Sequence, residues 1–188
     1  MKREIRILGI DDAPFNKFKD KGKNLLVVAT LYRGANYMDG LLSTKIKVDG
    51  SNSTSQLIKM INKCKFKPQI RIIMLDGIAL GGFNIVNIEK LHKKTKIPVI
   101  VVIRKMPDFK KIENALKKLK KAGKYKLIQK AGKPVKTNGI YIQFRGLTFE
   151  KAKQVIKMSC PHSLIPEPIR VAHIIASGIK EGQSRGRA

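Results

Sequence analysis

Three apolar segments of strand length lie in the first quarter of the chain, at residues 4–10, 25–32 and 41–48. The first alternates and then runs apolar into Asp11 and Asp12, and a proline two residues later stops it. The second is continuously apolar and the third alternates, with turn residues between them. This pattern predicts an antiparallel three-stranded start to a sheet.

Beyond residue 48, segments whose apolar residues are spaced as in a helix alternate with segments spaced as in a strand. Turn and N-cap residues at 49–54 precede positions spaced for a helix that begins near residue 53. Apolar strands are expected at 70–75 and 98–103, with a helix that starts near Asn84 between them. Strand, helix and strand in this order predict parallel pairing with right-handed crossovers.

The last part of the sequence predicts three more helices and two short strands. They are a very basic helix after Asp108, short strands at Leu127-Ile128 and 139–143, a helix from Thr148 through Met158, and a last helix from Pro166 to about Gly178. We therefore expect an α/β fold in a single domain over residues 1–179, followed by a basic flexible tail over residues 180–188.

Basic residues far outnumber acidic ones, with 40 Lys and Arg against 13 Asp and Glu and a formal charge of +27. A field of this size concentrates polyanions, so nucleic acid is the expected partner, although many of the lysines could simply solvate helix faces. The apolar runs are far shorter than the roughly 20 residues of a membrane span. The N-terminus shows no secretory signal, so a cytoplasmic location is expected.

Several of the few acidic residues fall at predicted strand ends: Asp11 and Asp12 close the first strand, Asp49 the third and Asp76 the fourth. If the first and fourth strands are neighbours, Asp11 and Asp76 meet at the edge where open α/β sheets place their sites. Oxygen ligands without Cys or His suit Mg²⁺ or Mn²⁺, which can activate water for phosphodiester cleavage. Taken one at a time, an Asp-Gly pair is equally typical of a tight turn.

Longer motifs extend this picture over nearly the whole chain. They are Gly-Ile-Asp-Asp-Ala-Pro-Phe at 9–15, Arg33-Gly34, Val48-Asp49-Gly50, the run from Leu75 to Asn84, Arg104-Lys105-x-Pro107-Asp108, and Pro166-Glu167-Pro168-x-Arg170-x-Ala172-His173. In these motifs the chain resembles the uncharacterised, largely archaeal group known as domain of unknown function 99, and through it endonuclease V.

The resemblance to endonuclease V is ordered along the chain. The similar segments are, in order, its strand-separating segment at 37–43, its second aspartate motif at 76–77, its Pro-x-x-Gly-Val-Ala-Lys strand at 98–105 and its Leu-Pro-Glu-Pro-Thr-Arg segment at 165–173. The resemblance implies a ribonuclease H-like mixed sheet flanked by helices, antiparallel in its first three strands and parallel afterwards. It also implies Mg²⁺-dependent cleavage of DNA or RNA one bond beyond a deaminated adenine, with Asp11 and Asp76 as metal ligands.

The chain departs from endonuclease V at several functional positions. The metal glutamate of that family falls on Ile46, so Asp49 could replace it only if the third strand ends differently. The histidine after its second aspartate falls on Gly82, and its Ser-Pro-Gly-His turn falls near residues 143–146, which contain no histidine. The specificity of endonuclease V is therefore not transferred to this chain.

Basic residues add candidate phosphate contacts to the predicted site. Arg104 takes the position of the catalytic lysine of endonuclease V, and Lys105 stands beside it. Either side chain could steady a phosphate at the end of its strand, or pair locally with Asp108. Arg33 and Arg145 are further candidates for binding phosphate.

Glycines and aromatic residues are the remaining candidates. Backbone N–H groups at Gly81 and Gly82 could hold an anion, or the two glycines could form a plain tight turn. By the resemblance, Tyr37 and Phe83 are placed near a base extruded from the stack. His173 falls among apolar positions of the last helix and is interpreted as a hydrogen-bonded core histidine.

The leading hypothesis is a Mg²⁺- or Mn²⁺-dependent nucleic-acid phosphodiesterase or endonuclease whose ligands are Asp11, Asp49 and Asp76, with Asp12 in support. The alternative is a non-catalytic nucleic-acid-binding protein on a degenerate nuclease scaffold, because functional positions of endonuclease V are missing. A metal enzyme that acts on a small phosphorylated substrate is a third hypothesis, which the fold alone does not exclude. The sequence leaves open DNA against RNA, base specificity, protein partners and oligomeric state.

Overall fold

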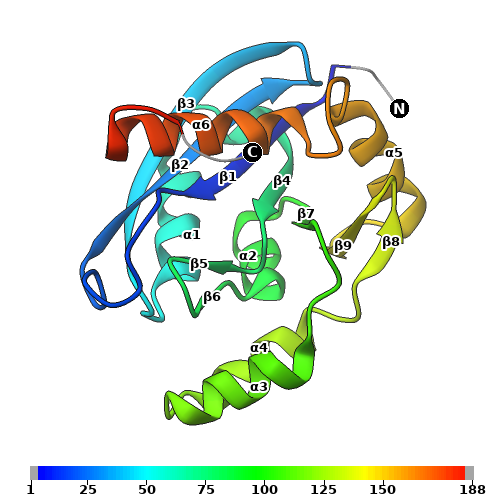
Figure 1. Ribbon diagram of the computed structural model, residues 1–188. Helices are drawn as coiled ribbons and strands as arrows, with labels where there is room; N and C mark the ends of the chain where they lie inside the picture. Colours follow the sequence, from blue (N-terminus) through cyan, green and yellow to red (C-terminus); the bar gives the residue numbers. More distant parts are fainter. Residues whose placement is uncertain (1–3, 185–188) are drawn as a thin grey trace.

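The computed structural model describes residues 4–184 and shows a mixed sheet with helices on both faces (Figure 1). In these residues the main sheet has seven strands in the order β3-β2-β1-β4-β7-β9-β8, and β5 and β6 form a separate two-stranded ribbon. The strands are β1 (Arg6–Asp12), β2 (Asn24–Arg33), β3 (Tyr37–Lys47), β4 (Ile70–Asp76), β5 (Ala79–Leu80), β6 (Asn84–Ile85), β7 (Val99–Ile103), β8 (Val135–Thr137) and β9 (Ile140–Arg145).

The directions of the strands divide the main sheet into three parts. β2 pairs antiparallel with both β1 and β3, whereas β1, β4 and β7 run parallel to one another. β9 pairs antiparallel with β7 and with the edge strand β8. The predicted antiparallel start followed by parallel strands is confirmed, and the structure adds an antiparallel pair at the far edge.

Helices cover both faces of this sheet (Figure 1). They are α1 (Ser53–Lys63), α2 (Ile88–Thr95), α3 (Phe109–Lys118), α4 (Tyr125–Lys130), α5 (Phe149–Ser159) and α6 (Glu167–Glu181), with short 3₁₀ turns at Lys67–Gln69 and Ala122–Lys124. Leu8 and Ile10 of β1 belong to the same apolar cluster as α1 and α2, whereas Ile7 clusters with α5. Because alternate residues of a strand point to opposite faces, β1 is buried on both sides. Within residues 4–184, the helices lack the length and apolar character needed to cross a membrane.

The start of α6 lies directly on β1, where Gly9 has no side chain. A Cβ atom at Gly9 would collide with the backbone of Pro168 and Ile169. On the neighbouring strand β2, the hydroxyl of Thr30 donates a 2.6 Å hydrogen bond to the carbonyl of Pro168. These contacts fix where the later turns of α6 lie above the sheet.

The predicted helix start at Asn84 is wrong. Asn84 belongs to β6, and α2 begins at Ile88 after the N-cap residue Asn87. The Asn84 side chain is buried, where it accepts a hydrogen bond from the N–H of Ser53 and donates to the carbonyl of Lys47. These long-range bonds hold residue 84 in an extended connection and delay the helix by one turn.

The predicted strand at Leu127-Ile128 is also wrong, because these residues lie in α4. Ile128 packs against Leu116 of α3 and Ile85 of β6. Two adjacent apolar residues are compatible with the spacing of a helix and with that of a strand. Packing against α3 favours the helix here.

The last helix extends further than predicted. α6 continues to Glu181, so the first two residues of the expected tail belong to it. Residues 185–188, the end of that tail, lie outside the described residues. The single-domain assignment stays a prediction.

Replacing Gly9 with alanine should destabilise the fold, because the added methyl group meets the backbone of α6, which cannot move aside as a flexible side chain would. We expect the free energy of unfolding to fall by about 3 kcal/mol in urea denaturation. Gly123→Ala is the matched control, since a Cβ there meets nothing within 4 Å. Equal stability of the two variants would contradict the close packing of α6 on β1.

Candidate active site

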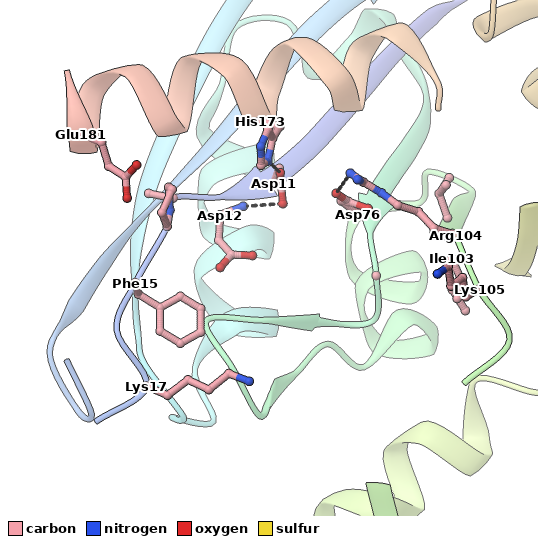
Figure 2. Close-up of a pocket in the computed structure, with 14 residues that line it drawn as sticks. Asp11, Asp12, Phe15, Lys17, Asp76, Ile103, Arg104, Lys105, His173 and Glu181 are labelled. Carbon is pink, nitrogen blue, oxygen red and sulfur yellow. Dashed lines mark hydrogen bonds and ion pairs between the residues drawn. The ribbon is translucent and has the colours of Figure 1, made fainter. Parts of the chain in front are cut away.

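An open pocket of about 800 Å³ lies at the carboxyl ends of the parallel strands β1, β4 and β7 (Figure 2). Its lining includes Asp11, Asp12, Asp76, Arg104, Lys105 and His173. The register of the sheet explains the pairing of carboxylates, because Ile10 of β1 lies opposite Leu75 of β4. The next residues along these two strands, Asp11 and Asp76, therefore lie at neighbouring strand ends, as the sequence analysis expected.

Asp11 is held in place by two contacts and is only 5% exposed. One carboxylate oxygen accepts from the N–H of Asp12 at 2.8 Å, and the other lies 2.9 Å from Nδ1 of His173. His173 reaches the pocket from α6 (Figure 2), where the sequence analysis had interpreted it as a core residue. The motif that ends in Ala172-His173 was a signal for it, but only the packing of α6 on Gly9 places it beside Asp11.

Asp12 lines the same pocket from the last position of β1. Its carboxylate accepts a hydrogen bond from the N–H of Gly81 at 3.0 Å. The pKa of Asp12 is raised from 3.8 to about 7, mainly by burial and also by repulsion from Asp11, and the Gly81 hydrogen bond offsets only part of this rise. Near neutral pH the Asp12 carboxyl group is therefore divided between its charged and neutral forms.

Asp76 forms an ion pair with the guanidinium that follows β7. Nη2 of Arg104 lies 3.0 Å from Oδ2 of Asp76 (Figure 2). Burial raises the pKa of Asp76, as does repulsion from Asp11, and the nearby Arg104 offsets only part of this rise. The sequence analysis had left open a local pair of Arg104 or Lys105 with Asp108. The Asp108 side chain pairs with Lys111 of α3 and caps that helix. The pocket thus has one buried carboxylate, two half-buried carboxylates and two basic side chains.

Asp49 does not reach this pocket. It follows β3 with a φ of +56°, and its N–H donates to the carbonyl of Gly81 at 2.7 Å. Its carboxylate accepts from the N–H of Phe83 at 2.8 Å and lines a second pocket of about 510 Å³. Ile46, where the endonuclease V resemblance puts a glutamate, is fully buried. The structure therefore separates Asp49 from the other predicted metal ligands.

The loop at residues 81–83 holds carboxylates of the protein itself. Gly81 donates its N–H to Asp12, and Phe83 donates to Asp49. Gly81 and Gly82 have φ values of +58° and +80°, which favour glycine, and a Cβ at Gly82 would collide with the Asp49 carboxylate. The N–H groups of this loop thus bind carboxylates of the same chain. The Phe83 side chain lines the second pocket, and its contact with a base stays a prediction.

Three predicted nucleic-acid-binding residues lie away from the pocket and its carboxylates: Arg33, Tyr37 and Arg145. Arg33 pairs with the first residue of β1, roughly 20 Å along the strand from its carboxyl end. Its guanidinium binds Asp39 at 2.9 Å and lies 5.6 Å from the centre of the Tyr37 ring. Arg145 pairs with the first residue of β7, again at the opposite end from the pocket. The structure does not bring these three residues to the predicted site.

The pocket has the donor chemistry of a site for a hard divalent cation, although residues 4–184 contain no group of three or more His, Cys, Asp or Glu side chains already arranged as a metal site. Asp11, Asp12 and Asp76 offer oxygen ligands, which Mg²⁺ and Mn²⁺ prefer. Repulsion among these carboxylates raises the pKa of Asp12 and of Asp76, and a cation between them would remove it. The residues present therefore fit such an ion.

The mixed sheet, with carboxylates at the ends of β1 and β4, defines an α/β protein with the fold of endonuclease V. The crystal structure of Ciona intestinalis endonuclease V, in complex with a 24mer DNA containing an inosine followed by a ribo-adenosine, matches with a TM-score of 0.53. The match covers 90% of this chain and 82% of that one at 15% sequence identity. At this identity the likeness shows the fold alone.

The chain belongs to the endonuclease dU family, whose family model matches residues 3–180. A UPF0215 protein from Methanothermobacter thermautotrophicus is 44% identical over 193 residues, covering 100% of this chain and 94% of that protein. The crystal structure of a protein of unknown function from Archaeoglobus fulgidus has a TM-score of 0.86 at 38% identity, covering 94% of this chain and 98% of that one. The resemblance is thus confirmed at the level of an archaeal family with the endonuclease V fold.

Replacing Asp12 with asparagine should stabilise the fold at about pH 8 but not at about pH 4. Because the pKa of Asp12 is about 7 in the fold and 3.8 ordinarily, the unfolded chain releases this proton first, and stability falls as the pH rises between these values. We expect a gain on the order of 2 kcal/mol at the higher pH, measured by urea denaturation in EDTA. Glu89→Gln is a control of opposite sign, because the hydrogen bond from Lys93 lowers the pKa of Glu89 and the substitution should cost stability at the higher pH. An equal gain for Asp12→Asn at both pH values would contradict its raised pKa.

Proposed function

We propose that the protein is a divalent-metal-dependent endonuclease that cleaves a phosphodiester bond of nucleic acid in the pocket of Figure 2. The observation that carries this proposal is the position of Asp11 and Asp76 at neighbouring strand ends, with Arg104 and Lys105 on the same pocket. Metal-assisted phosphodiester hydrolysis requires oxygen ligands for a cation and positive charge for the phosphate. The net charge of +27 adds long-range attraction for the substrate.

The name of the family, endonuclease dU, favours nucleic acid that contains deoxyuridine as the substrate. The fold neighbour is an endonuclease V bound to DNA that contains inosine. Deoxyuridine and inosine are the nucleosides left by deamination of deoxycytidine and of adenosine. We therefore take nucleic acid with a deaminated base as the substrate class, with deoxyuridine in DNA as the first member to test.

Asp11 and Asp76 would hold the metal ion, with Asp12 in support. When bound, Mg²⁺ or Mn²⁺ supplies an activated water and neutralises charge on the phosphate. The side chain of His173 fixes the orientation of the Asp11 carboxylate through the 2.9 Å contact. Arg104 donates an N–H group to Asp76, and a guanidinium is the kind of group that binds phosphate. Lys105 adds a second positive charge to the same edge.

A non-catalytic nucleic-acid-binding protein on the same scaffold is the second candidate. The observation that favours it is the buried Ile46 where endonuclease V has a metal glutamate, together with the separation of Asp49 from the pocket. With fewer acidic ligands the site would bind a cation more weakly. Such a protein binds nucleic acid and leaves it intact, which separates the two candidates in one assay.

Wild-type protein should cleave DNA that contains deoxyuridine when Mn²⁺ or Mg²⁺ is present, and Asp76→Asn should lower the rate at least about 100-fold, because the cation loses a charged ligand. The measurement uses end-labelled single- and double-stranded DNA and RNA with one deoxyuridine or uridine, one inosine or neither. Glu89→Gln is the control, since it removes one negative charge from a half-exposed position of α2 outside the pocket. Cleavage that survives Asp76→Asn would contradict the proposed site, and binding without cleavage by wild type would favour the second candidate.

Mn²⁺ alone should raise the melting temperature of the wild-type protein, because a ligand that binds only the folded state stabilises it, by about 2.7 kcal/mol at 100 times its Kd. Asp11→Asn should remove most of this shift while keeping an oxygen near His173. Asp49→Asn is the matched control, since it removes the same charge from outside the pocket and should keep the shift. The measurement is a thermal titration with Mn²⁺, and loss of the shift in Asp49→Asn alone would contradict the assignment of ligands.

A further inference from the structure

The segment between β7 and β8 forms a helical arm that projects from the body of the protein (Figure 1). We name residues 104–134 the basic arm, which contains α3, the 3₁₀ turn at Ala122–Lys124 and α4. Its sequence has one arginine and eleven lysines against two acidic residues, Asp108 and Glu113. Twelve of the 40 basic residues of the chain therefore lie in this one segment.

Apolar packing fixes the basic arm to the body of the protein. Phe109, Ile112 and Leu116, at helical spacing on α3, belong to one cluster with Ile85 of β6 and Ile128 of α4. The opposite side of α3 is left for polar residues. The arm is thus an amphipathic element with a defined solvent face.

Two lysines anchor the arm to the loops beside the pocket. Nζ of Lys124 donates to the carbonyl oxygens of Asp49 at 3.2 Å and of Phe83 at 2.7 Å, and also to that of Gly50. Nζ of Lys121 donates to the Asp49 carbonyl at 2.7 Å. These loops include the glycine segment that holds Asp12, so the arm and the carboxylates share one support.

The basic arm borders the candidate site with its first residues and the second pocket near its middle. Its first residues, Arg104 and Lys105, line the carboxylate pocket. Leu119, just after α3, lines the second pocket together with Phe18 and Lys17, and Lys17 also lines the first pocket. The arm therefore runs beside the site rather than on a remote surface.

Several lysines of the arm are exposed and unneutralised. Lys111 and Lys117 pair with the two acidic residues of the arm, at 3.5 Å and 2.8 Å. Lys110, Lys118 and Lys120 are exposed and make no ion pair within the described part of the chain. Like charges held together without counterions favour a polyanionic partner.

We propose that the exposed lysines of the basic arm bind the sugar-phosphate backbone of the nucleic acid on one side of the reacting nucleotide. The inference rests on the proposed function for the location of that nucleotide. The ten residues of α3 extend about 15 Å at roughly 1.5 Å per residue, which matches four to five phosphates spaced about 3.4 Å apart on one strand. A nucleic-acid backbone is therefore the occupant whose charge and spacing fit the arm.

The test compares two triple variants with the same loss of charge. Lys110→Gln, Lys118→Gln and Lys120→Gln change the arm, whereas Lys151→Gln, Lys153→Gln and Lys157→Gln change exposed positions of α5. Binding of labelled deoxyuridine DNA is measured in EDTA over a range of salt concentrations, so that the measurement does not depend on cleavage.

The arm variant should bind at least about 10-fold more weakly at low salt, and the slope of log K against log salt should become shallower by about 2 to 3, because each phosphate contact contributes about 0.7 to 0.9. The α5 variant should keep the wild-type slope. Equal losses in the two variants would overturn the proposal, since general charge would then explain binding. Arm-dependent binding by a wild type that cleaves nothing would leave the arm established and sink only the proposed nuclease activity.

The side of the substrate gives a second readout. Shortening the DNA by about five nucleotides on one side of deoxyuridine should weaken binding of the wild type, and the same change should have little further effect on the arm variant, because both remove the same contacts. Shortening the other side should weaken both proteins equally. Additive losses for both sides would overturn the assignment of the arm to one flank.

Discussion

The close contact of α6 with β1 is the constraint on which the geometry of the pocket depends. Gly9 lets the backbone of Pro168 and Ile169 approach the strand, and Thr30 binds the Pro168 carbonyl. One helical turn later, His173 comes to lie 2.9 Å from the Asp11 carboxylate. A residue without a side chain, in the middle of a buried strand, thus determines the surroundings of a charged group two residues further on.

The second constraint is electrostatic, because the pocket gathers three buried or half-buried carboxylates in a protein that is otherwise strongly basic. Asp11, Asp12 and Asp76 each have a separate partner: an imidazole, a backbone N–H and a guanidinium. These partners do not remove the repulsion, since the pKa values of Asp12 and Asp76 remain raised. The fold tolerates these carboxylates, and a bound cation would stabilise them further. Carboxylates with raised pKa values of this kind are more typical of functional sites than of structural ion pairs.

Local sequence patterns predicted the strands that carry the site and the pairing of Asp11 with Asp76, because strand ends follow directly from apolar runs. They could not place Asp49, since its backbone turns into the left-handed region and its carboxylate caps the Phe83 N–H. The role of His173 also could not be derived, because its partner is 162 positions away in the sequence. Contacts of this kind depend on how two elements pack, and periodicity describes only one element at a time.

The division of charge in the structure links the two proposals. Acidic groups gather in a pocket where a cation and the scissile phosphate would meet, and a basic arm anchored beside that pocket carries lysines that the protein does not neutralise. A uniformly basic surface would attract nucleic acid without orienting it, because a field of one sign has no preferred register. Lysines held along the basic arm at the edge of the site would give the nucleic-acid backbone a direction. Binding on the arm would then bring a particular phosphodiester bond to Asp11 and Asp76.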